Sequence, residues 1–168
     1  SNTVRGLENG SGTINLIPAV ATAGIGGSGR FYSRGTLNID KPMDLSVLMD
    51  LQGNVNINNS LVNVTPTGQF LLQTILTTGV LNLNNSTLAL NGATLFNGPL
   101  TNINGNGTIA INTGATLQAG DTGNIANTIV LELNGGSIAD AQFLTIPDQF
   151  NINSGNISGV GSFVTPGT

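Results

Sequence analysis

The sequence predicts an all-β protein, folded as a right-handed parallel β-helix (β-solenoid) of roughly seven irregular coils. Three observations predict this fold. A degenerate motif recurs along the chain, apolar and polar residues alternate within each copy of it, and Asn and Gly punctuate the copies. An antiparallel β-sandwich or jelly roll is the alternative, because Asn-Gly pairs also form the turns of antiparallel hairpins.

The repeat is clearest between residues 55–70 (VNINNSLVNVTPTGQF) and residues 81–96 (LNLNNSTLALNGATLF), which lie 26 positions apart. The string Asn-Asn-Ser is identical in the two segments. Further on, residues 87–98 recur as residues 108–120 with one inserted residue. The alignment at the offset of 26 predicts that five apolar pairs stack: Val55/Leu81, Ile57/Leu83, Val62/Leu88, Val64/Leu90 and Phe70/Phe96.

The core of the motif is apolar-x-apolar-Asn-x-x-x-apolar, and its starts are spaced by about 23 residues on average. Within each period, short alternating segments follow one another about every seven residues. Three strands per period is what one coil of a parallel β-helix requires. The period is too loose for a leucine-rich repeat. The starts lie near residues 14, 37, 55, 81, 101, 131 and 150.

The chain is predicted to be a single domain. Residues 1–34 are Gly-rich and less periodic, and they are predicted to form an N-terminal cap or first coil; residues 35–168 form the repeat body. Two stretches, residues 44–52 and 70–78, fit either a turn of helix or a longer strand, and the neighbouring strands favour a strand. Residues 162–165 are predicted to form a last short strand.

Polar residues at one position of the motif predict a hydrogen-bonded ladder along the stack, because Asn side chains in register bond to one another. Solvated turn residues are the alternative. The predicted ladder consists of Asp40, Asn58, Asn84, Asn104, Asn134 and Asn153. On the inward side, we expect Ile57, Leu83 and Ile103 to stack in neighbouring coils.

Composition excludes several classes of function. The chain of 168 residues has no Cys and no His, so the residues that most often bind transition metals or act as general bases are missing. Charged residues make up 7%, with four Lys and Arg and a net charge of -4. This composition provides no basic surface for nucleic acid. No run approaches the ~18 apolar residues of a membrane helix, so membrane insertion is not expected.

No catalytic, cofactor-binding or metal-binding residue is predicted. The eight acidic residues are scattered, and although stacked coils could pair two of them as a glycosidase requires, the Lys and Arg residues that usually surround such a site all lie in the first quarter of the chain. Asp40, Asp44 and Asp50 are the candidate oxygen ligands for a calcium ion, but solvated surface charge is the favoured interpretation. Phe31-Tyr32 beside Arg30 and Arg34 is the one aromatic-basic cluster, for which packing of the cap is favoured over contact with a sugar or partner.

Residues 81–96 and residues 104–120 (NGNGTIAINTGATLQAG) resemble the passenger regions of bacterial autotransporters and of filamentous-haemagglutinin-like exoproteins. The resemblance covers residues 35–158. It implies a right-handed parallel β-helix, secretion to the bacterial cell surface or beyond, and an adhesive role. The chain is short for a passenger region.

From these observations we expect a non-enzymatic, extracellular structural or adhesive module of a bacterial surface or secreted protein. Its expected partners are a host or cell-surface receptor or glycan, or copies of itself joined through the chain ends. One alternative is a self-assembling extracellular filament or biofilm-matrix subunit, since the open ends of a solenoid stack without closing. Another is a carbohydrate-binding or carbohydrate-degrading β-helix.

Overall fold

The computed structural model describes residues 8–17, 24–65, 69–72, 80–97, 102–119, 124–140, 143–145, 147–159 and 162–164. Every regular element in this part of the chain is a β-strand, and none is a helix. The strands are β1 (Glu8–Asn9), β2 (Thr13–Leu16), β3 (Gly24–Ser33), β4 (Thr36–Ile39), β5 (Met43–Leu51), β6 (Asn54–Asn58), β7 (Leu61–Val64), β8 (Gln69–Leu72), β9 (Val80–Asn84), β10 (Thr87–Leu90), β11 (Thr94–Asn97), β12 (Asn102–Gly105), β13 (Thr108–Asn112), β14 (Thr116–Ala119), β15 (Asn124–Ile125), β16 (Val130–Asp140), β17 (Phe143–Thr145), β18 (Gln149–Gly159) and β19 (Ser162–Val164).

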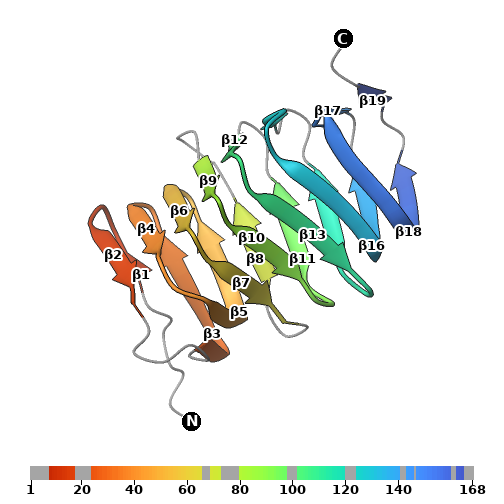
Figure 1. Ribbon diagram of the computed structural model, residues 1–168. Helices are drawn as coiled ribbons and strands as arrows, with labels where there is room; N and C mark the ends of the chain where they lie inside the picture. Colours follow the sequence, from red (N-terminus) through yellow and green to blue (C-terminus); the bar gives the residue numbers. More distant parts are fainter. Residues whose placement is uncertain are drawn as a thin grey trace.

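One face of the molecule is a six-stranded sheet in the order β2-β4-β6-β9-β12-β15, and all its strands are parallel. The chain returns to this face once per coil (Figure 1). Six consecutive strands define about five turns of a β-solenoid. The residues that stack at one inward position are Ile14, Leu37, Val55, Leu81, Ile103 and Ile125.

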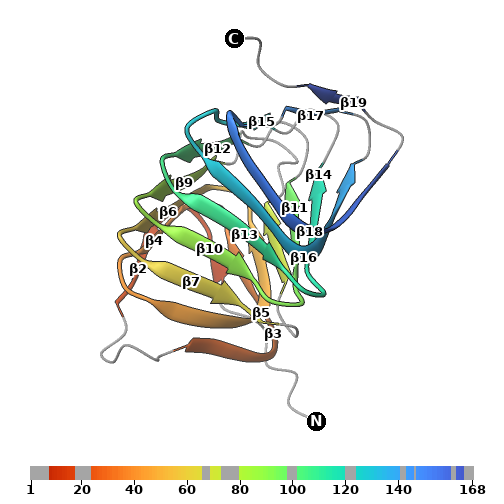
Figure 2. The same cartoon turned by 45° about the vertical axis from the view of Figure 1, so that its right-hand side comes forward.

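The other two faces belong to an eleven-stranded sheet that turns a corner. The first residues of β5, up to Leu45, pair with β7, and those from Leu48 onward pair with β8. In the same way β16 pairs first with β13 and then with β14. Figure 2 shows these strands bending from one face to the next. Each coil therefore has three strand positions, as the sequence predicted.

The number of turns is lower than the roughly seven predicted. The motif copies that begin near residues 131 and 150 lie in β16 and β18. In the eleven-stranded sheet, β16 stacks on β13 and β18 stacks on β16. They are not further strands of the six-stranded sheet. The reason is that apolar-x-apolar-Asn suits any face whose alternate residues point inward, so the same motif marks two different faces.

The core is a set of apolar columns that run along the stack. Val62, Leu88, Ile109 and Leu131 form one of them, each in register with the next and each fully buried. Burying one such side chain stabilises the fold by about 1.5–3 kcal/mol relative to leaving it exposed. Leu88 and Ile109 are the equivalent inward residues that the repeat predicted.

One predicted stack is wrong in its last member. Ile57 pairs with Leu83, as expected, but the residue in register with Leu83 in the next coil is Gly105. Ile103 stacks instead on Leu81, two residues earlier. Gly105 has a φ of +106°, and a Cβ atom on it would lie 2.2 Å from the carbonyl oxygen of Leu83. The backbones of the two coils lie so close together at this corner that no apolar side chain fits above Ile57 and Leu83.

Of the two ambiguous stretches, residues 44–52 lie almost wholly in β5, which confirms a strand. The side chains of β5 alternate inward through nine residues, with Met43, Leu45, Val47, Met49 and Leu51 all buried. Residues 69–72 form β8, and residues 73–79 lie outside the described part of the chain.

Leu88→Ala tests the inward assignment. We expect it to lower the free energy of unfolding by about 2–4 kcal/mol, because Leu88 is fully buried between coils. The half-buried outward neighbour, changed as Thr87→Ala, should alter it by no more than about 0.5 kcal/mol. Urea denaturation followed by circular dichroism measures both, and equal losses would contradict the assignment of faces.

Candidate functional surface: the asparagine ladders

The outer surface of the six-stranded sheet carries a row of amide side chains that bond to one another. Asn38 donates from Nδ2 to Oδ1 of Asn15 at 2.7 Å, and Asn56 donates to Asn38 at 2.7 Å. Asn82 extends the row by donating to Asn56 at 2.8 Å. We call Asn15, Asn38, Asn56 and Asn82 the face ladder. Its members repeat at the spacing of the coils, roughly 4.8 Å.

The ladder predicted from the motif forms in part. Asn58 donates to Asp40 at 2.7 Å and Asn84 donates to Asn58 at 2.8 Å, which confirms the first three members. Asn104 is displaced, because its register partner is Asn82 of the face ladder. The expectation that all six residues share one row is therefore wrong. The same register that stacks Ile103 on Leu81 places Asn104 on Asn82.

Asn134 and Asn153 belong to another row, which we call the corner ladder because it follows a bend of the eleven-stranded sheet. Asn112 donates to Asn91 at 2.9 Å, Asn134 donates to Asn112 at 3.4 Å, and Asn153 donates to Asn134 at 2.6 Å. Each such bond stabilises the fold by about 0.5–1.5 kcal/mol.

The identical Asn-Asn-Ser strings form corners in which the serine side chains are buried. Asn59 and Asn85 adopt left-handed backbone angles, with φ of 47° and 48°, a conformation that Asn tolerates. Ser86 follows directly and is 4% exposed. Its Oγ lies 2.8 Å from the carbonyl oxygens of Ile57 and Asn84, and accepts the backbone N–H of Ser60 at 3.2 Å. The repeated Asn-Asn-Ser string predicted that the two segments are structurally equivalent, but it did not predict this buried hydrogen-bond network.

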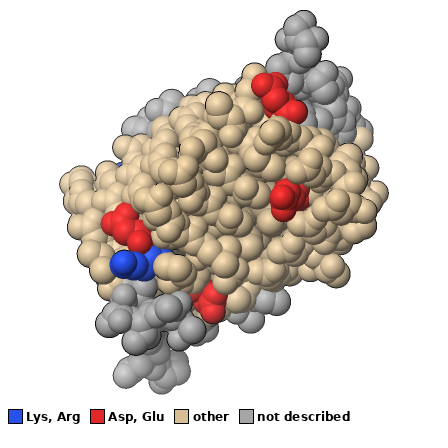
Figure 3. Space-filling model, viewed as in Figure 1, with Lys and Arg blue, Asp and Glu red and all other residues tan. Residues whose placement is uncertain are grey.

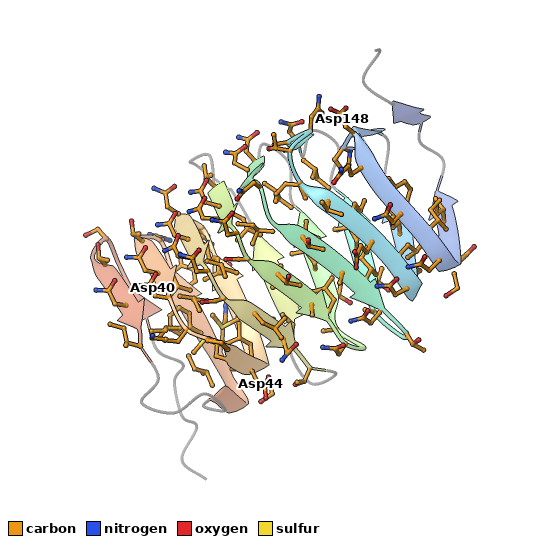
Figure 4. All side chains as sticks on the ribbon, in the orientation of Figure 1. Asp40, Asp44 and Asp148 are labelled. Carbon is orange, nitrogen blue, oxygen red and sulfur yellow. The ribbon has the colours of Figure 1, made fainter. Side chains whose placement is uncertain are left out.

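The three acidic residues weighed as a calcium site do not converge. Asp40 accepts a hydrogen bond from Asn58, and Asp44 accepts one from Asn63 at 2.8 Å. Figure 4 shows Asp40 and Asp44 on different parts of the N-terminal coils, with Asp148 near the other end of the stack. Within the described ranges, no group of three or more His, Cys, Asp or Glu residues is placed to hold a metal ion.

Asp50 is fully buried, although the alternation of β5 directs it outward. Its carboxylate forms an ion pair with the guanidinium of Arg30, whose side chain is 50% exposed. Arg30 and Arg34 both lie over the ring of Tyr32, at 5.3 and 5.4 Å from its centroid. The Tyr32 hydroxyl donates to Oε1 of Gln52 at 3.0 Å and accepts from Nε of Arg34.

The aromatic-basic cluster is therefore divided between two environments. Phe31 points inward, is 2% exposed and joins the apolar core, while Tyr32 holds the two arginines on the outside of the same strand. The packing favoured from sequence accounts for Phe31. The buried ion pair between Asp50 and Arg30 was missed, because strand alternation alone places Asp50 in solvent.

Charge is confined to the two ends of the stack. Residues 51–120 contain no Asp, Glu, Lys or Arg. All four cationic residues precede residue 42, and residues 121–168 contain four acidic residues and no cationic one. Figure 3 shows this division, with blue atoms only toward the N-terminal end and a broad uncharged surface between. Polar recognition along the middle coils must therefore use amides and hydroxyls.

Comparison with protein-family models, with curated proteins and with solved structures found no match for this chain. The described residues also include no helix that is long and apolar enough to cross a membrane.

Ser86→Ala tests the buried corner network. We expect a loss of about 1–3 kcal/mol in the free energy of unfolding, because the backbone N–H of Ser60 would lose its acceptor in a buried position. Ser158→Ala, on the exposed strand β18, is the control and should change it by no more than about 0.5 kcal/mol. Chemical denaturation compares the two, and a loss at Ser86 as small as the control would disprove the network.

Arg30→Met tests the ion pair. Removing one partner of a buried pair costs about 3–5 kcal/mol, and the half-exposed Arg30 places the expected loss near the lower figure. Adding Asp50→Asn should recover most of that loss, because no uncompensated charge then remains buried. Thermal and urea unfolding of the single and double variants decide the point. An additive double variant would show that the two groups do not interact.

Proposed function

We propose that this chain is a non-enzymatic, extracellular structural or adhesive module of a bacterial surface or secreted protein, and that the outer surface of its six-stranded sheet contacts an uncharged glycan. The observation that carries this proposal is the face ladder. Its amides are held in fixed positions by one another, and no charged residue lies in the coils from β6 to β14.

The ladder leaves hydrogen-bonding capacity for a ligand. An Asn side chain has two N–H donors and an oxygen with two lone pairs. Asn38 and Asn56 each use one donor and one acceptor within the ladder, so one N–H and one lone pair on each are left over for water or a ligand. Sugar hydroxyls both donate and accept, and match such a pair. Because the amides are already ordered, little side-chain entropy is lost on binding.

Repetition favours a polymeric ligand over a small one. Equivalent groups recur at roughly 4.8 Å along the stack and at roughly 6.8 Å between alternate residues of one strand. A second row, Thr13, Thr36, Asn54, Val80, Asn102 and Asn124, lies beside the face ladder. A linear chain laid along these rows would make the same weak contact several times, and linked contacts raise the overall affinity.

Binding to a panel of immobilised neutral polysaccharides tests the proposal. The double variant Asn54→Lys/Asn124→Lys places two bulky cations on exposed positions of the six-stranded sheet, outside the hydrogen-bonded ladder, and should lose binding at least tenfold. Thr113→Lys/Gln118→Lys adds the same charge at two exposed positions away from the six-stranded sheet, one in the turn after β13 and one in β14, and should bind as the unchanged chain does.

Three results would count against this function. Release of new reducing ends from any of these polysaccharides would show an enzyme. Equal loss of binding in both double variants would show that net charge, and not the amide surface, governs binding. Failure of the unchanged chain to bind any neutral glycan would remove the adhesive role.

A further inference from the structure

The C-terminal end of the eleven-stranded sheet presents a long strand with one free edge. β18 pairs with β16 along both of its halves, from Gln149 to Ile152 and from Asn156 to Gly159. No strand in the described part of the chain pairs with its opposite edge. Every residue from 151 to 159 is exposed. Nothing in the sequence of β18 blunts this edge, since it contains neither Lys nor Pro.

The apolar columns of the core are uncovered at this end. Ile152 stacks on Leu133 and Ile157 stacks on Ile138. Leu133 and Ile138 are fully buried, whereas Ile152 is 57% and Ile157 is 36% exposed. These two isoleucines occupy inward positions, so a further parallel coil placed over β18 would bury them as the earlier coils bury their equivalents.

The opposite end has a matching surface. β2 pairs with β4 on one side only, as far as the described residues extend, and Ile17 beyond it is 65% exposed. Ile14 and Leu16 are partly buried against the core. In the eleven-stranded sheet to which β18 belongs, the strand at this end is β3, which pairs with β5 along one edge and, among the described residues, with β1 only at Tyr32 and Ser33 along the other. All these pairs are parallel, so β3 offers the strand direction that β18 needs in a partner.

The charges select which ends can meet. Residues 121–168 carry four negative charges and no positive one, while residues 1–50 carry four of each sign, including every cation of the chain. Joining two C-terminal ends would bring like charges together. Joining a C-terminal end to an N-terminal end places acidic groups such as Asp148 near Arg34 and Lys41, which are all exposed.

We propose that the free edge of β18, with Ile152 and Ile157, docks the N-terminal coil (β1 to β3) of a second copy of this chain, head to tail. The contact extends the parallel sheets and buries both apolar ends. The contact is heterologous, and because it continues the coil-on-coil stacking along one axis, it does not close into a ring and adds copies without limit. It does not depend on the glycan-binding function proposed above, because a single copy retains the face ladder.

Sedimentation velocity of the purified chain over a range of concentrations is the first test. We expect the fraction of the chain in species larger than a monomer to increase with concentration. High salt should lower this fraction, because it screens the charges at the two ends. Ile152→Lys/Ile157→Lys should abolish this association without loss of folding, as both residues are already exposed. Leu61→Lys, 43% exposed on a strand inside the stack, should associate normally. A monomer at millimolar concentration would overturn the proposal.

A mixing experiment tests the direction of docking. Ile152→Lys/Ile157→Lys blocks the C-terminal end, and Ile17→Lys at an exposed position blocks the N-terminal end. Each variant alone should be monomeric, and an equimolar mixture should give a dimer, because one free end of each kind is left. Dimers of the Ile17→Lys variant alone would show that two β18 edges pair with each other, and would overturn the head-to-tail arrangement. Glycan binding by either monomer tests the other proposal separately.

Discussion

The whole structure depends on one constraint, which is that each coil must lie in parallel register on the coil before it. Backbone hydrogen bonds join strands that lie roughly 4.8 Å apart, so every side chain contacts its equivalent in the next coil. Inward positions therefore repeat as apolar columns, such as Val62, Leu88, Ile109 and Leu131. Outward positions repeat as ladders. Where the spacing between coils changes, the equivalent residues change with it, so that Gly105, and not Ile103, lies in register with Leu83.

The sequence predicts the coils well where the loop lengths are equal and poorly where they change. The offset of 26 holds from Val55/Leu81 to Val64/Leu90. It fails at Phe70, whose partner is Leu95 and not Phe96, because the corner between β10 and β11 is one residue shorter than that between β7 and β8. The motif alone also does not say which face a strand occupies, which is why β16 and β18 were counted as extra coils.

The sequence predicted that Asn side chains form ladders on the surface, but it did not predict correctly which residues share one ladder. Stacked like charges at the coil spacing would repel by about 1 kcal/mol even in water, whereas Asn donates to one neighbour and accepts from another. An Asp has only acceptors at neutral pH, so it can only begin such a row. Asp40 and Asp44 do so, each accepting from an Asn in the next coil. The burial of Asp50 has no sequence signal, because it depends on what covers a face that alternation directs to solvent.

The uncharged middle of the chain has a consequence for how the protein responds to its surroundings. Residues 51–120 contain no Asp, Glu, His, Cys, Tyr, Lys or Arg, and they include the strands from β6 to β14. Stability depends on pH only through groups that bind protons differently in the folded and unfolded states, and these coils have none. Acid or alkali therefore changes the protonation of the two ends alone, and the central coils meet a gastric, marine or cytoplasmic pH in the same chemical state.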